Sequence, residues 1–84
     1  MNSEEKETYK KLVTESLAKK EKDYYALVED IYVGWRFLNS KKNMRNPRRS
    51  LKLIKRDLST EILPKMVERG EITIDFGGAY KLGK

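Results

Sequence analysis

Residues 63–82 read LPKMVERGEITIDFGGAYKL and contain the change from a helical to a strand-like pattern. The residues before Gly70 continue a helical pattern, and glycine is the residue that most often ends a helix. From residue 72 onward isoleucine and phenylalanine alternate with polar residues, which is the two-residue period of a β-strand. Gly77-Gly78 marks a turn, and residues 79–82 follow as a second strand. We therefore predict a C-terminal β-hairpin.

The register of this hairpin follows from which residues can share one buried face. A two-residue turn at the two glycines would mix apolar and polar side chains on each face. A three-residue loop over residues 77–79 sets Phe76 opposite Tyr80 and Ile74 opposite Leu82, and it pairs opposite charges on the outer face. We therefore predict the three-residue loop.

Two helices are predicted at the beginning of the chain. The first spans residues 3–20, with Ser3 as its N-cap and apolar residues at helical spacing. The second spans residues 23–33 and begins at Asp23, with Gly34 as its end. Residues 35–38 either extend this helix or form a short extended piece. A polar, basic loop is expected to follow over residues 39–46.

A third helical segment is predicted to begin at Asn46-Pro47, because proline suits the first turn of a helix. It continues to Gly70, and Pro64 must disturb it because proline lacks a backbone N–H and clashes with the preceding turn. We expect a kink near Thr60 or a break into two helices, with Ser59 capping the second.

The apolar residues at these periodic positions form the expected core. They are Leu12, Leu17, Leu27, Val28, Ile31, Leu51, Ile54, Leu58, Ile62, Val67, Ile72, Ile74 and Leu82. Helical spacing also places Tyr24, Tyr32, Trp35 and Phe37 in or beside the core. The alternative for these four aromatics is a base-stacking platform.

The composition excludes several classes of function. The 84 residues suffice for a single domain, 1–84, and they include neither cysteine nor histidine. Disulfides, Cys/His zinc sites and imidazole acid–base chemistry are therefore excluded. The N-terminus is not a signal peptide, and no apolar run approaches the length of a membrane span. Glu29 and Asp30 point in different directions on a helix and cannot act as an acid–base pair, and 84 residues leave little room for a closed pocket. We therefore expect no enzyme, no cofactor and no small-molecule ligand.

The positive charge is concentrated in one part of the chain. The net charge is +6, but residues 31–56 carry nine basic side chains and no acidic one, while the flanking regions are slightly acidic. Such a block repels itself, and a polyanion commonly compensates it. On a helical wheel the basic residues of 48–56 fall on one arc, next to the arc of Leu51, Ile54 and Leu58.

The order of two helices, a basic turn, a third helix and a hairpin resembles a winged helix-turn-helix domain. The resemblance is most specific in residues 63–74 and 77–82, which are similar to the end of a recognition helix and two wing strands. Residues 9–13, YKKLV, are similar to the first helix of linker-histone globular domains. The resemblance implies a mainly α fold with a small β-hairpin, and duplex DNA as the partner. The uncharged Gly-Gly-Ala tip and the long loop before the third helix depart from the family pattern.

We therefore expect a duplex DNA-binding protein, either a small transcriptional regulator or a chromatin-type protein, in the cytoplasm and nucleoid, or in a nucleus. The expected DNA-binding residues are Lys41, Lys42, Arg45, Arg48, Arg49, Lys52, Lys55 and Arg56. The alternative is a winged-helix module that docks an acidic protein, with Trp35, Phe37 and Met44 as anchors; an exposed aromatic beside the basic patch would favour it. A membrane surface fits less well, because the basic stretch lacks a bulky apolar face. The oligomeric state stays open between a monomer and a homodimer.

Overall fold

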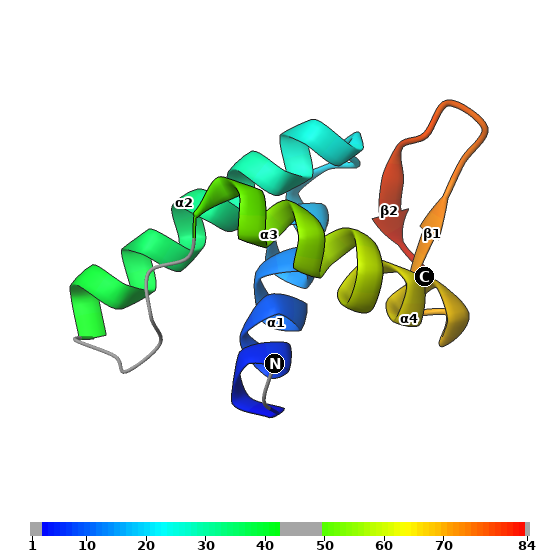
Figure 1. The fold of residues 1–84 in the computed structure, drawn as a ribbon. Coiled ribbons are helices and arrows are strands. Elements are labelled where there is room, and N and C mark those ends of the chain that lie inside the picture. The colour runs from blue at the N-terminus through cyan, green and yellow to red at the C-terminus, as the bar shows by residue number, and fades with distance from the viewer. Residues whose placement is uncertain (1–2, 43–49, 84) are drawn as a thin grey trace.

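The structure is a computed structural model that describes residues 3–42 and 50–83, and the side chains of these residues except 39–42. Helix α1 (Ser3–Lys19) packs against α2 (Tyr24–Lys42), and a third helical segment crosses α2 (Figure 1). That segment comprises α3 (Leu51–Asp57), a π-helical part (Leu58–Ile62) and α4 (Leu63–Glu68). Strands β1 (Ile72–Ile74) and β2 (Tyr80–Leu82) form an antiparallel pair. The described residues are therefore mainly helical with a small two-stranded sheet, as predicted.

Helix α2 begins where the sequence predicts and ends nine residues later than predicted. The carboxylate of Asp23 accepts a hydrogen bond from the backbone N–H of Ala26 at 2.8 Å, so it caps the first turn. Gly34 does not end the helix. Instead, the side chain of Leu12 packs directly over it. A Cβ at Gly34 would lie 2.7 Å from Leu12 Cδ2. This glycine serves the close contact between α1 and α2, and residues 39–42 are helical instead of forming a loop.

Helix α3 begins at Leu51, later than the sequence predicts. Ser50 has extended backbone angles, and its hydroxyl accepts a hydrogen bond from the N–H of Leu53, so Ser50 is the N-cap. Asn46 and Pro47, the predicted start, lie outside the described residues.

Pro64 interrupts the α-helical hydrogen bonding, as predicted, but it does so through a π-helical segment. The N–H of Leu63 donates to the carbonyl of Leu58, five residues earlier, which is the spacing of a π-helix. Ser59 does not cap a second helix. Its hydroxyl and that of Thr60 instead donate to the carbonyl of Arg56, at 3.3 and 2.7 Å.

Gly70 ends α4, as the sequence predicts. Its φ of 75° lies in the left-handed region, where glycine has no Cβ penalty. The N–H of Gly70 donates to Val67 and that of Glu71 to Met66, the two hydrogen bonds of a Schellman motif.

The hairpin register differs from the prediction by two residues. Ile72 pairs with Leu82 and Ile74 pairs with Tyr80, so the loop spans residues 75–79. One carboxylate oxygen of Asp75 accepts hydrogen bonds from the N–H groups of Gly77 and Ala79, which fixes the longer loop. A shift of two preserves which face each side chain occupies, because the side-chain period of a strand is two. Phe76, predicted to pair with Tyr80, is instead fully exposed in the loop.

The hairpin is attached to the helices through the connection between α1 and α2. Lys22 and Tyr80 exchange two backbone hydrogen bonds, of 3.0 and 2.7 Å, as an isolated antiparallel bridge. The ammonium group of Lys22 also donates to the carbonyl of Ser16 at 2.6 Å. The connection before α2 therefore acts as a one-residue third strand beside β2.

The core lies between α1, α2 and the third helical segment, with Ile72 contributed by the hairpin. Eight of the thirteen predicted core residues are buried, and Leu12 and Leu82 pack against the core from its edge. Leu51, Val67 and Ile74 are exposed, contrary to the prediction. Leu51 and Val67 lie near the two ends of the third segment, and Ile74 lies beyond the helices that cover Ile72. Trp35 is buried in the core, as helical spacing predicts, and the core also includes residues outside the predicted set: Tyr9, Val13, Leu63 and Met66.

None of the helices within residues 3–42 and 50–83 combines the length and the apolar character that crossing a membrane requires.

Candidate nucleic-acid interface

Three of the eight predicted DNA-binding residues lie together on the outer side of α3. Lys52, Lys55 and Arg56 are spaced i, i+3 and i+4, so their side chains fall within an arc of about 100°. Lys52 and Arg56 are exposed and Lys55 is half-buried. The opposite side of α3 carries the buried Ile54 and Asp57. The amphipathic pattern of this helix therefore separates a packing face from a cationic face.

Of the other five predicted residues, the two that the structure describes lie on α2 and not on α3. Lys41 and Lys42 belong to the last turn of α2, the end of the helix that projects away from α3 in Figure 1. Arg45, Arg48 and Arg49 lie outside the described residues, as does Met44, the proposed protein anchor. The basic block is thus divided between the end of one helix and the start of the next.

Lys55 lies beside the first turn of α2, where two tyrosines surround it. Its Nζ is 5.8 Å from the centroid of the Tyr25 ring, a cation–π distance, and Tyr25 is 69% exposed. Tyr24 lies edge-on to Tyr25 and donates its hydroxyl to the carbonyl of Lys55 at 3.0 Å. These contacts hold α3 against α2 and place an exposed aromatic ring next to the cationic face.

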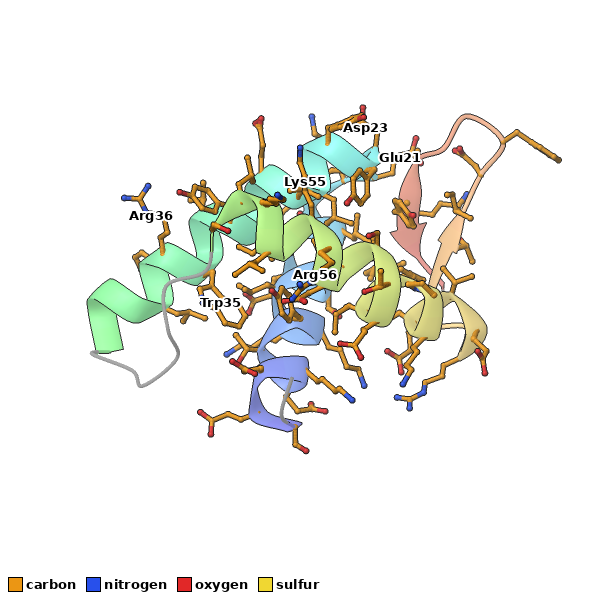
Figure 2. All side chains as sticks on the ribbon, in the orientation of Figure 1. Glu21, Asp23, Trp35, Arg36, Lys55 and Arg56 are labelled. Carbon is orange, nitrogen blue, oxygen red and sulfur yellow. The ribbon has the colours of Figure 1, made fainter. Side chains whose placement is uncertain are left out.

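Arg36 adds a further exposed cation, from α2. In Figure 2, Arg36 and Lys55 both extend from the same edge of the molecule, although they belong to different helices. The guanidinium of Arg36 lies 5.6 Å from the centroid of the Tyr32 ring. Sequence reasoning counted Arg36 in the basic block but left it out of the binding set. The helical phase of α2 could have indicated its exposure, since Trp35 occupies the adjacent buried position.

Asp57, which directly follows the basic block in the sequence, points toward the core. Asp57 is only 5% exposed, and its carboxylate accepts a hydrogen bond from the hydroxyl of Tyr9 at 2.9 Å. The guanidinium of Arg56 lies 3.7 Å from the other carboxylate oxygen, while its own side chain stays largely exposed. Asp57 therefore contributes to the contact between α1 and α3 and leaves the outer face of α3 cationic.

The contact between Tyr9 and Asp57 gives a prediction for stability. Tyr9→Phe removes the hydroxyl donor and leaves the ring, so we expect the free energy of unfolding to fall by about 1.5–3 kcal/mol, the range for hydrogen bonds to charged groups. Urea denaturation followed by circular dichroism measures this loss. Tyr25→Phe removes a hydroxyl from an exposed ring and should change stability by less than about 0.5 kcal/mol. Equal effects of the two variants would contradict the role of Asp57.

Tyr80 contributes no charge near this region at neutral pH. Burial raises the pKa of Tyr80 above its ordinary value of 10.0, and the neighbouring phenol of Tyr24 raises this pKa further. The Tyr80 phenol therefore stays neutral well above pH 7. The charges beside α3 come from lysine, arginine and the carboxylates alone.

The part of the chain that the structure describes contains no cluster of three or more acidic side chains suited to a metal ion. The outer side of α3 offers cations and hydroxyls, with the exposed ring of Tyr25 beside them. Lys52, Lys55 and Arg56 can donate to phosphate oxygens, and the hydroxyls of Ser59 and Thr60 lie on the next turn.

No family model matches the chain, and its comparison with curated proteins and with solved structures finds no similar protein.

Proposed function

We propose that this chain is a winged-helix domain that binds duplex DNA through the cationic face of α3. The observation that carries the proposal is the grouping of Lys52, Lys55 and Arg56 on the outer side of one helix, while Asp57 is buried on the inner side. Phosphate contacts from such a face supply most non-specific DNA affinity. Lys41, Lys42, Arg45, Arg48 and Arg49 belong to the same basic block of the sequence, and we include them in the proposed DNA-binding set.

The arrangement of the helices and the hairpin supports the winged-helix part of the proposal. The first part of the third helical segment, α3, faces solvent. The hairpin follows the last part of that segment, α4, along the chain (Figure 1). The bridge between Lys22 and Tyr80 holds the hairpin against the helices, so the hairpin has a fixed position relative to α3. An exposed cationic helix in a segment that is followed by a hairpin suits a groove and its flanking phosphates.

The first test is the salt dependence of binding to a mixed-sequence duplex, measured by fluorescence anisotropy. Contacts with about five to seven phosphates should give a slope of roughly −4 to −6 for the logarithm of the association constant against the logarithm of salt concentration. An affinity that does not change with salt would contradict phosphate binding.

The second test is the double variant Lys52→Ala/Lys55→Ala. Each lost charged contact should cost on the order of 1 kcal/mol, so we expect about 30-fold weaker binding and a salt slope that falls by about 2. The thermal midpoint should fall only slightly, because Lys52 is exposed and the cation–π contact of the half-buried Lys55 with the exposed Tyr25 ring contributes about 0.5–1 kcal/mol. The control Lys20→Ala/Lys65→Ala removes the same charge from exposed positions outside the α3 face. If both doubles weaken binding equally, only the net charge matters and the proposed face is wrong.

The second candidate function is docking to an acidic protein, and the exposed ring of Tyr25 beside Lys55 favours it. Exposed tyrosine next to cations is typical of protein-binding hot spots. Trp35 cannot serve as the anchor considered from the sequence, because it is 1% exposed. Tyr25→Ala separates the two functions. If phosphate contacts dominate, this variant should change DNA affinity by no more than about twofold. Salt-independent, weak DNA binding by the wild-type protein would favour the acidic partner instead.

A further inference from the structure

A groove of about 490 Å³ lies along the contact between α1 and α2, on the side of α2 that carries its exposed apolar residues. Its apolar lining consists of Leu12, Val33, Gly34, Phe37 and Leu38. Val33 is 65% exposed and Phe37 is 58% exposed, and they lie one helical turn apart. Exposed apolar side chains that line one groove commonly mark a binding site for another protein surface.

The groove continues along the part of α2 that extends beyond its neighbours. Figure 1 shows the C-terminal end of α2 projecting past α1 and α3, so no helix or strand within residues 3–42 and 50–83 covers one side of this end. The length arises because α2 runs through Gly34 to Lys42. Gly34, which the sequence suggested as a helix end, thus lies where Leu12 of α1 meets α2, between the exposed Val33 and Phe37.

The rim of the groove carries both charges in equal number. Lys11 and Lys19 are the cations, and Glu15 and Asp30 are the anions. Asp30 is held in place by the hydroxyl of Ser16 at 2.7 Å and by the ammonium group of Lys22 at 3.6 Å. A chain with a net charge of +6 therefore has one surface whose charges balance. Neither a polyanion nor a strongly acidic protein is selected by such a rim.

We propose that a second copy of this chain occupies the groove and forms a two-fold symmetric dimer. In an isologous interface each patch meets itself, so the lysines of one rim can face the carboxylates of the other without net repulsion. The cationic face of α3 cannot meet itself in this way, because its like charges would repel. Phe37 of each protomer enters the groove of its partner and covers Val33 and Leu12. The dimer leaves both α3 faces exposed.

Sedimentation velocity of the purified protein without DNA tests the dimer over about 1–500 µM. The weight-average mass should rise from 9.9 kDa toward twice that value. Val33→Glu/Phe37→Glu places carboxylates in the apolar contact and should weaken dimerisation on the order of 100-fold. Tyr25→Glu/Phe76→Glu changes two exposed aromatic positions outside the groove and should leave the dimer intact. A wild-type protein that stays monomeric at about 500 µM overturns the proposal, as does an equal loss of dimer in both variants.

Disulfide trapping gives a second measurement that does not depend on the folding of the glutamate variant. The natural chain has no cysteine, so a single introduced thiol can link only to another copy. Val33→Cys should form a disulfide-linked dimer under mild oxidation, at least about 10-fold faster than Phe76→Cys on the hairpin loop. Equal rates for the two positions would overturn the proposed interface. Both measurements omit DNA, so their outcome is independent of the DNA-binding proposal.

Discussion

Replacing Trp35 by alanine should lower the free energy of unfolding by about 3–5 kcal/mol, the usual range for removing a buried large aromatic. Trp35 is 1% exposed, and its ring centroid lies 4.7 Å from that of Tyr9, which joins α2 to α1. The total stability of a chain of this size is about 4–13 kcal/mol, so the loss takes a large share of it. Urea denaturation followed by circular dichroism is the appropriate measurement, because the variant has no tryptophan left.

Phe37→Ala is the matched control for this prediction. Phe37 lies two residues further along the same helix but is 58% exposed, so we expect a loss below about 1 kcal/mol. The measurement should be made at a few micromolar protein, where the proposed dimer contributes little. Similar losses for the two variants would show that α2 is rotated about its own axis, so that Phe37 is buried as deeply as Trp35.

Replacing Ile72 by alanine should lower the free energy of unfolding by about 2–5 kcal/mol. Its side chain is fully buried, and it is the residue of β1 that reaches the helical core. The cavity left behind would lie where the hairpin meets the helices, so the hairpin itself should lose order. Amide hydrogen exchange at Thr73 and Lys81 would report this local loss together with global urea denaturation.

Ile74→Ala is the matched control in the same strand. Ile74 shares the face of Ile72 but is 49% exposed, and a smaller loss, below about 1.5 kcal/mol, is expected. The sequence alone predicts similar losses, because the alternation of apolar residues places both side chains in the core. A large loss at Ile74 would therefore contradict its exposure in the structure and place it in the core, as the sequence pattern predicts.

The candidate site was only partly predictable. The concentration of basic residues in 31–56 is a property of the sequence, and so is the helical spacing of Lys52, Lys55 and Arg56. The separation of Lys41 and Lys42 from α3 was not predictable, because it depends on the length of α2. Helical spacing placed Tyr24 and not Tyr25 beside the core, but the contact of the exposed Tyr25 ring with Lys55 was missed, because it joins two helices.

The sequence by itself determined the helical and strand periods, the cap at Asp23, the helix end at Gly70 and the disturbance at Pro64. These features depend on interactions between residues a few positions apart, and such interactions are present wherever the segment is placed. Residue type and spacing therefore suffice to predict them.

Only the tertiary structure decided the continuation of α2 to Lys42, the partner of the buried Trp35 and the inward orientation of Asp57. Each depends on a partner distant in sequence: Leu12 packs over Gly34, Tyr9 contacts Trp35, and the Tyr9 hydroxyl binds Asp57. The hairpin register was likewise decided by the Asp75 carboxylate, which stabilises a five-residue loop, and by the bridge from Lys22 to Tyr80. The alternation of apolar and polar residues is the same for two registers that differ by two residues. The register was therefore set by specific hydrogen bonds of the loop and of the Lys22–Tyr80 bridge, which the alternation does not reveal.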